Sequence, residues 1–151
     1  MGLTLDVGCG KRPDGDVDCD LTIQKGVPNF VRCNAEYLPS REGSFDVVLS
    51  YYAIEHCLDL LRLLRELYTV SLSRVELLTD NALWYLYLHR KLRGQSACFD
   101  YERHYHIFFP KTCMRLLHML GYDATVSAGN FVSNQKTPNV QKLFTNAPSA
   151  G

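Results

Sequence analysis

Short apolar runs alternate with helical patterns along most of this chain. The run at residues 45–51, with the sequence FDVVLSY, is the clearest strand signal, because it is apolar, β-branched and preceded by Gly43 and Ser44. Similar but shorter runs predict further strands at 3–7, 17–21, 29–33, 75–78, 122–126 and 140–144.

Three segments have the spacing of amphipathic helices. Residues 58–70 place Leu60, Leu61, Leu64 and Leu67 at helical intervals. Residues 82–92 form a strongly apolar helical segment, and residues 111–120 carry an apolar face that ends before Gly121, a residue typical of helix C-termini. We expect irregular structure at 95–109 and a loop or hairpin at 127–139.

Strands that alternate with helices predict an α/β fold. We expect a Rossmann-like, mostly parallel sheet with helices on both faces and a C-terminal antiparallel strand. The length of 151 residues fits one domain, which we place at 1–147, followed by a frayed tail at 148–151. Ligands of such sheets bind at the carboxyl ends of the strands.

The charges are balanced overall but not along the chain. Lys and Arg number 16, and so do Asp and Glu, so there is no basic excess of the kind that a general nucleic-acid binder shows. Residues 1–59 carry 5 basic and 10 acidic groups, whereas residues 60–151 carry 11 and 6. Two different ligand surfaces would explain this asymmetry, and so would ordinary solvated faces.

The six cysteines are scattered through apolar segments, and no pair has the CxxC spacing of a zinc site. We therefore expect no metal, reduced thiols and a cytoplasmic location. The longest purely apolar run, residues 82–88, is far shorter than a bilayer span, so we expect no transmembrane segment.

A glycine turn follows the first strand. Residues 6–10 read DVGCG, and glycines let the backbone turn sharply and approach a ligand closely. The third glycine of a dinucleotide fingerprint is replaced by Pro13, which weakens an NAD interpretation. Asp20 ends the second strand, where an acid can hold the ribose hydroxyls of a nucleoside. Asp18 takes this place if the strand ends earlier.

The ordered series DVGCG, D, NAExLP, GSFDVVLS and IEH resembles the class I methyltransferases that use S-adenosylmethionine. It is most similar to the group called methyltransferase domain 11, and the resemblance covers residues 3–126. The segment RHYHIFFPKTCMRLLHMLGY is similar to the same group.

The resemblance implies a set of contacts to the cofactor, S-adenosylmethionine. The first motif would wrap its methionine and ribose parts, Asp20 would hold the ribose diol, and Asn34 stands beside the adenine where the family usually has Asp. The cofactor-binding residues expected in this way are Asp6, Gly8, Cys9, Gly10, Asp20, Asn34, Ala35, Leu38, Ser50 and Tyr51.

Histidines near the acceptor side are candidates for a general base or an acceptor contact. His56 matches the fourth-strand motif, and imidazole titrates near neutral pH. His104 and His106 would share one face of an extended segment, and of these two we select His106. For all three, packed or solvated histidines are the alternative. The segment 82–94 is either a core helix with a cationic end or a cover for the acceptor or a membrane surface.

We therefore expect a methyltransferase that acts on a hydroxyl, amine or carbon of a small-molecule, sugar or lipid acceptor, one that is amphiphilic or anionic. The alternative is a non-catalytic methyltransferase-like binding or partner subunit with a reduced cofactor site. It is favoured by two departures from the family, namely no glycine pair before the fifth strand and no helix before the first. A third departure is Pro13, which with Asp14 and Gly15 leaves room only for a short turn after the glycines. A homodimer or a completing partner chain is also expected. A nucleic-acid methyltransferase is disfavoured by the charge and by SYYA after the fourth strand, where an NPPY-type segment would stand.

Overall fold

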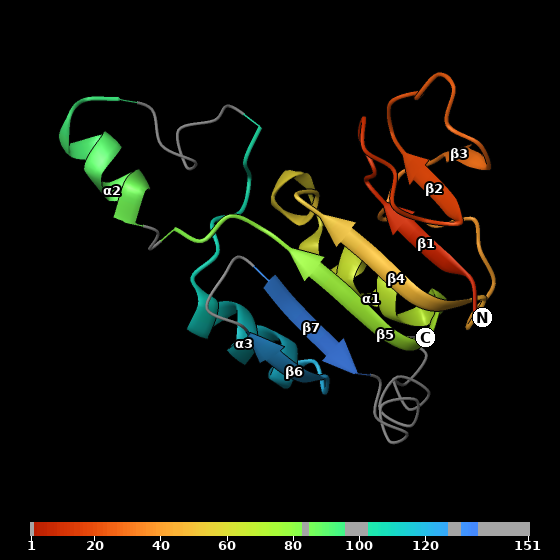
Figure 1. Ribbon diagram of the computed structural model, residues 1–151. Coiled ribbons are helices and arrows are strands. Elements are labelled where there is room, and N and C mark those ends of the chain that lie inside the picture. The colour runs from red at the N-terminus through yellow and green to blue at the C-terminus, as the bar shows by residue number, and fades with distance from the viewer. Residues whose placement is uncertain (1, 83–84, 96–102, 127–130, 136–151) are drawn as a thin grey trace, which may run out of the picture.

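The computed structural model describes residues 2–82, 85–95, 103–126 and 131–135 (Figure 1). The described strands are β1 (Thr4–Val7), β2 (Val17–Asp20), β3 (Phe30–Arg32), β4 (Phe45–Tyr51), β5 (Ser71–Leu78), β6 (Asp123–Val126) and β7 (Phe131–Gln135). The described helices are the 3₁₀ turn η1 (Ile54–His56) and the α-helices α1 (Leu60–Val70), α2 (Tyr85–Leu92) and α3 (Pro110–Met119). The strand predicted at 140–144, the tail predicted at 148–151 and Cys98 lie outside the described residues.

All strands belong to one sheet with the order β3-β2-β1-β4-β5-β7-β6. Neighbouring strands from β1 to β5 pair in parallel, and β7 pairs antiparallel with both β5 and β6. The expected fold, a Rossmann-like and mostly parallel sheet with one antiparallel strand near the C-terminus, is confirmed.

The antiparallel strand is not where the sequence pattern placed it. We predicted a loop or hairpin at 127–139, but Phe131–Gln135 form β7. The sequence FVSNQ is mostly polar, so its strand signal is weak. Ladder hydrogen bonds to β5 on one side and β6 on the other make it a strand.

Helix α1 packs on β4 and β5 through the apolar stripe that its sequence predicts. Leu63, Leu64 and Leu67 are at most 2% exposed, and burial of such side chains stabilises the fold by roughly 1.5–3 kcal/mol each. Its N-terminus is capped by Asp59, whose Oδ1 accepts a hydrogen bond from the Arg62 backbone N–H at 3.0 Å. This cap explains why the helix begins at Leu60 rather than at Leu58.

Strand β5 is longer than predicted because it starts directly where α1 ends. Ser71 is extended, fully buried and paired with Phe45, and its hydroxyl donates to the Arg74 carbonyl oxygen at 2.9 Å. The turn usually made by a glycine pair is therefore absent. Residues 72–74 are exposed, which explains their weak apolar signal.

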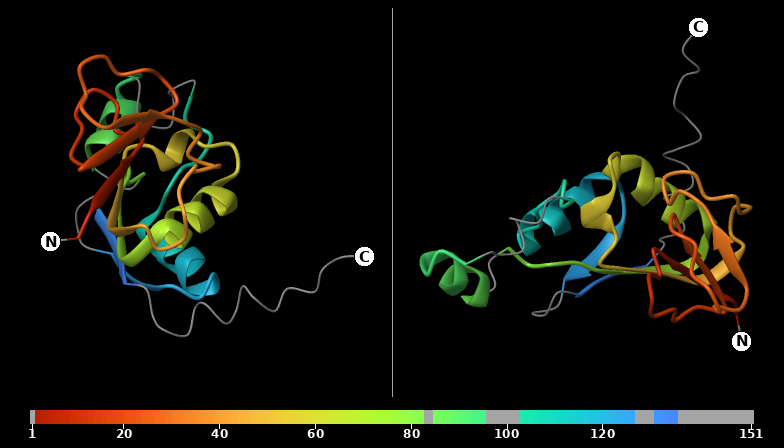
Figure 2. Two further views of the ribbon diagram at one scale, coloured as in Figure 1. Left: turned by 90° about the vertical axis from the view of Figure 1, so that its right-hand side faces the viewer. Right: turned by 90° about the horizontal axis from the view of Figure 1, so that it is seen from above.

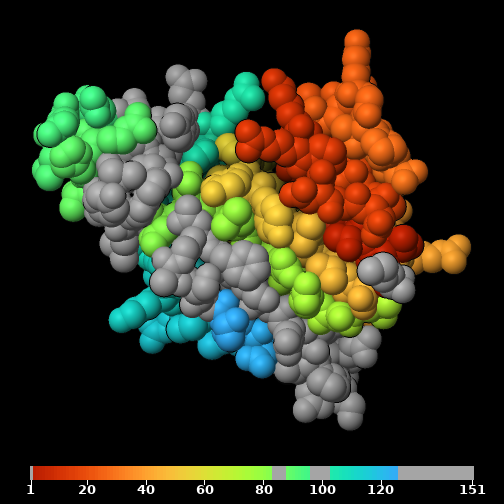
Figure 3. All heavy atoms as spheres, viewed as in Figure 1, coloured from red at the N-terminus to blue at the C-terminus, as the bar shows by residue number. Residues whose placement is uncertain are grey.

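The two faces of the sheet differ (Figure 2). Helices α1 and α3 lie on the same face, and α2 lies beyond the carboxyl end of β5. We expected helices on both faces of the sheet, but in the described residues helices pack against one face only. The connections at 8–16 and 21–29 fold as turns and bends instead. Figure 3 shows the opposite face, where atoms of β4 and β5 reach the surface below the N-terminal turn.

None of the helices that the structure describes has the length and apolarity to span a bilayer. The described cysteines are free thiols, as expected; they are Cys9, Cys19, Cys33, Cys57 and Cys113.

Candidate functional site

A cavity of about 510 Å³ opens at the carboxyl end of the sheet. Its lining comes from the glycine turn after β1, the end of β2, the turn after β3, the η1 region and the segment at 103–105. This volume lies in the range of small-molecule and cofactor sites, which is roughly 300–1,000 Å³. The structure therefore has a cavity where the sequence predicts a ligand site.

The glycine turn forms one wall of the cavity. Gly8 and Gly10 have φ values of +78° and +54°, in the left-handed region that favours glycine. The backbone N–H groups of Gly8 and Cys9 both donate to the Cys19 carbonyl oxygen, at 2.8 and 3.2 Å, and so fix the turn against β2. Cys9 is buried and does not line the cavity; its Sγ contacts the Gly10 carbonyl oxygen.

Asp20 lies at the cavity wall and holds two backbone segments together. Its Oδ2 accepts a hydrogen bond from Gly10 N–H at 3.0 Å, and its Oδ1 accepts one from Thr22 N–H at 2.7 Å. Each carboxylate oxygen has a second lone pair. Asp20 therefore retains the capacity to accept hydrogen bonds from a ligand in the cavity.

Asp6 and Asp18 lie beneath the turn and do not line the cavity. Both are 2% exposed. Asp6 Oδ2 accepts from Asp14 N–H at 3.1 Å, and Asp18 Oδ1 accepts from Gly15 N–H at 3.0 Å. Burial raises the pKa of Asp6 to about 6, and neighbouring carboxylates add to this rise. Between the two candidates for the ribose, the geometry favours Asp20, and the buried pair organises the loop.

The expected adenine side is only partly at the cavity. Asn34 and Ala35 line it, whereas Leu38 belongs to the hydrophobic core. Asn34 Oδ1 accepts from Glu36 N–H at 3.0 Å, so the side-chain carbonyl is engaged in its own turn. The remaining polar group of the side chain is the amide NH₂, which donates.

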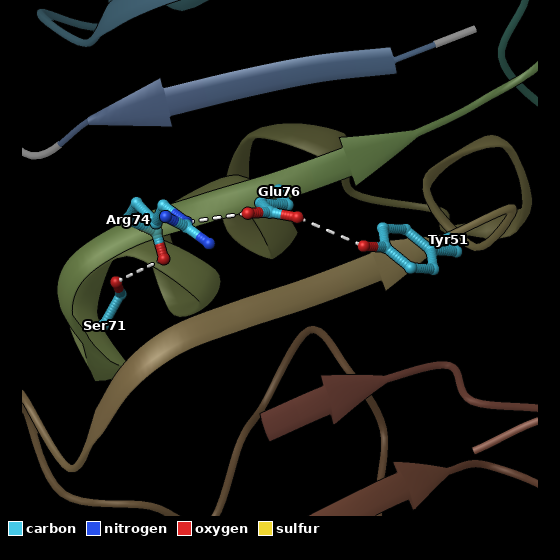
Figure 4. A network of polar contacts seen from close by, with 4 residues as sticks. All are labelled: Tyr51, Ser71, Arg74 and Glu76. Atoms are coloured by element: carbon cyan, nitrogen blue, oxygen red, sulfur yellow. Dashed lines mark hydrogen bonds and ion pairs between the residues drawn. The ribbon is translucent and has the colours of Figure 1, made fainter. Parts of the chain in front are cut away.

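Two of the residues expected at the end of β4 do not line the cavity. Ser50 is fully buried, and its hydroxyl has no hydrogen-bond partner among the described residues. Tyr51 donates to Glu76 Oε2 at 3.2 Å, and Glu76 also pairs with Arg74 at 2.7 Å (Figure 4). Burial and the Glu76 carboxylate raise the pKa of Tyr51 to about 12.

The two candidate histidines are placed differently. His56 lines the cavity, and its Nδ1 lies 2.9 Å from the Arg103 carbonyl oxygen. His106 does not line the cavity; its Nε2 is buried, with no hydrogen-bond partner in the described part of the chain. The cavity geometry thus selects His56 as the acceptor-side candidate.

Several lining residues were missed by sequence reasoning. Tyr52, Arg103 and Tyr105 line the cavity. Tyr52 has a φ of +54°, a conformation that costs energy for a bulky residue and often marks a functional site. For Arg103 and Tyr105, the sequence offers one signal, which is the basic and aromatic character of residues 101–106. We relate this character to the acceptor but not to the individual residues.

Three cysteines also line the cavity, namely Cys19, Cys33 and Cys57. The hydrogen bond with Cys33, together with burial, raises the pKa of the Cys19 thiol above its usual range. The Cys19 thiol is therefore protonated at neutral pH, whereas the same hydrogen bond lowers the pKa of the Cys33 thiol.

Comparison with known proteins agrees with this geometry. Residues 17–74 match the family model described as "Methyltransferase domain". No curated protein matches the sequence. Among solved structures, the chain is similar to a Thermotoga maritima protein described as a SAM-dependent methyltransferase and possible histamine N-methyltransferase. The TM-score is 0.69 at 16% identity, over 91% of this chain and 83% of that one.

Two further solved structures have the same fold. A SAM-dependent methyltransferase from Methanosarcina mazei gives a TM-score of 0.64 at 18% identity, over 89% of this chain and 92% of that one. Magnesium protoporphyrin IX methyltransferase from Synechocystis, solved with bound SAH, gives 0.63 at 13% identity, over 90% and 74%. The resemblance of this chain to the class I, domain 11-like methyltransferases is thus confirmed, by the family model over residues 17–74 and by the fold of the described chain.

Proposed function

We propose that this protein is an S-adenosylmethionine-dependent methyltransferase whose cofactor site is the cavity at the carboxyl end of the sheet. The observation that carries the proposal is the hydrogen bond from Gly10 N–H to Asp20. It brings the glycine turn and the acid expected to bind the ribose together in the lining of one cavity. The Synechocystis neighbour, solved with bound SAH, supports the choice of cofactor.

The cavity fits the cofactor at its nucleoside end. A Cβ added to Gly10 would meet no atom within 4 Å, so the glycine leaves open space beside Asp20. Asp20 would accept hydrogen bonds from the ribose hydroxyls. Asn34 would donate its amide N–H to a ring nitrogen of adenine, where the usual Asp accepts from the adenine amine.

At the other end of the cavity we place the methionine part and the acceptor. Arg103 lines the cavity beside His56, and its guanidinium suits the carboxylate of the methionine moiety. When bound, S-adenosylmethionine supplies an electrophilic methyl group on a sulfonium. His56 stands at the acceptor side, and its Nδ1 can only donate to the Arg103 carbonyl, so Nε2 carries the lone pair in the neutral ring. That nitrogen is able to take a proton from an acceptor.

The acceptor is proposed as a small molecule, sugar or lipid with a hydroxyl, amine or carbon nucleophile. Alignment of the acceptor with the methyl group supplies most of the rate enhancement, since proximity alone contributes up to roughly 7–11 kcal/mol. This leaves no requirement for a fixed catalytic triad.

Calorimetric titration with S-adenosylmethionine and S-adenosylhomocysteine tests the proposal. We expect binding in the wild-type protein and a Kd raised about tenfold in Asp20→Asn, which loses the charge and keeps one oxygen, able to accept from Gly10 N–H or from Thr22 N–H but not from both. Asp16→Asn is the matched control, because Asp16 also accepts a backbone N–H, from Thr4, but lies outside the cavity. Absence of binding by folded wild-type protein would overturn the enzyme proposal.

A non-catalytic partner subunit is the second candidate. It is favoured by the turn at 8–16, where no helix covers the sheet next to the cavity. A second chain would then complete the site. In that case the titration detects no binding by the isolated chain.

A further inference from the structure

Glu55, His56 and His104 come together from two segments that are far apart in the sequence. Glu55 and His56 lie in η1, and His104 lies in the segment after residue 102. Backbone N–H groups of Tyr105 and His106 donate to the Glu55 carbonyl oxygen at 2.9 and 3.3 Å. The bond between His56 and the Arg103 carbonyl adds a third link, so the position of His104 opposite η1 is fixed by the backbone.

The three side chains offer one carboxylate oxygen and two imidazole nitrogens, all within 4.8 Å of one another. The rings of His56 and His104 have centroids 4.6 Å apart and planes inclined by 73°. The Glu55 side chain is 2% exposed, and the Thr79 hydroxyl donates to its Oε2 at 3.2 Å.

The Arg103 carbonyl also determines which nitrogen of His56 is available. A carbonyl oxygen only accepts, so Nδ1 bears the hydrogen and Nε2 has the free lone pair. A ligating histidine that donates its other N–H to a backbone carbonyl is the usual outer-shell arrangement of protein metal sites. Thr79 orients the carboxylate in the same way.

We propose that Glu55, His56 and His104 bind a divalent transition-metal cation, and that zinc fits them best. Two imidazoles and one carboxylate suit zinc, whereas magnesium and calcium prefer oxygen ligands alone. Three protein ligands leave one position open, as in catalytic zinc sites. Ligand atoms of a tetrahedral zinc ion lie about 3.3 Å apart, so ligand atoms that now lie within 4.8 Å of one another would have to move closer around the ion. Cysteine spacing gave no sign of this site, because no cysteine is part of it.

A cation held there would lie beside the cofactor cavity, because His56 belongs to both. This consequence rests on the proposed function. An acceptor hydroxyl bound at the open position would lose its proton to solvent more readily. Its oxygen would then bond to the methyl carbon while the carbon–sulfur bond breaks and leaves a neutral thioether. His56 would act through the cation and not as the base.

The test is a titration of chelator-treated protein with Co²⁺, followed by its visible absorption, and with Zn²⁺ in competition with a chromophoric chelator. No cofactor is added, so the result is independent of the proposed function. We expect one equivalent to bind with tetrahedral cobalt absorption, and His104→Ala to weaken binding by about 100-fold or more. His89→Ala is the control, because His89 is exposed on α2, away from the cluster.

Glu55→Gln is the second variant, because it keeps the size of the buried side chain and the bond to Thr79. We expect it to weaken binding while the melting temperature shows that the protein is folded. Lack of stoichiometric binding by wild-type protein would overturn the site, and so would binding that His104→Ala and Glu55→Gln leave unchanged. Metal binding without cofactor binding would contradict the proposed function alone, and the reverse result would contradict the metal site alone.

Discussion

Gly10 donates its backbone N–H to Oδ2 of Asp20 at 3.0 Å, across the carboxyl ends of β1 and β2. This bond connects a residue without a side chain to the acid that faces the ribose in the proposed complex. The same acid therefore shapes the turn and is positioned by it. Substitutions in the turn are expected to separate its structural and binding roles.

The two glycines of the turn should respond differently to alanine. A Cβ on Gly8 would lie 2.5 Å from the Ala53 Cβ, whereas a Cβ on Gly10 would meet nothing within 4 Å. Both substitutions place a side chain at positive φ, which costs roughly 1–2 kcal/mol, and the clash at Gly8 adds about 1–3 kcal/mol. Urea denaturation should show the larger loss of stability in Gly8→Ala, and calorimetry should show weaker cofactor binding in Gly10→Ala. Equal losses of stability would contradict the geometry of the turn.

Asp6 should make stability depend on pH between about 4 and 6. Burial raises its pKa from 3.8 to about 6, so the folded state binds the proton more tightly than the unfolded state does. The free energy of unfolding contributed by this group is therefore highest at low pH and falls as the pH rises through this window, by about 3 kcal/mol at most.

The variant Asp6→Asn removes this titration and keeps an oxygen for Asp14 N–H. The stability of the variant relative to wild type should therefore increase between pH 4 and pH 7, measured by urea denaturation at both values. A difference that does not change with pH would contradict the buried, protonated carboxyl.

Arg103 should contribute to binding only through the amino-acid part of the cofactor. Arg103→Ala is expected to raise the Kd for S-adenosylmethionine about tenfold, the worth of one charge-assisted pair. The Kd for 5′-methylthioadenosine, which lacks the amino acid, should stay the same. Arg93→Ala, which lies outside the cavity, is the control. A loss of affinity for both ligands would assign Arg103 to the nucleoside end.

Tyr51 should matter for stability and not for the cofactor. Its hydroxyl donates to Glu76 and it does not line the cavity. Tyr51→Phe removes one hydrogen bond to a charged group and should lower the free energy of unfolding by at most about 3 kcal/mol. The Kd for S-adenosylmethionine should not change. Impaired cofactor binding in a folded Tyr51→Phe protein would restore Tyr51 to the site.

The sequence by itself determined the α/β fold, most element positions and the presence of Gly8, Gly10 and Asp20 at one cavity. These features depend on local patterns: apolar periodicity for β4 and α1, and glycines with a following acid for Gly8, Gly10 and Asp20. Each pattern lies within a short stretch of chain and leaves a direct trace in the residue order.

Only the tertiary structure decided the rest. Strand β7 was missed because its pairing partners, rather than its composition, make it a strand. The side on which Tyr51 lies depends on the register of β4 with β5, in which a shift of one residue exchanges the two faces. Arg103 and His104 reach the site because the His56 ring bonds to the Arg103 carbonyl oxygen and the Glu55 carbonyl oxygen accepts from Tyr105 and His106 N–H, nearly fifty residues later in the chain. Such long-range contacts leave no periodicity in the sequence, because they depend on how the sheet brings distant segments together.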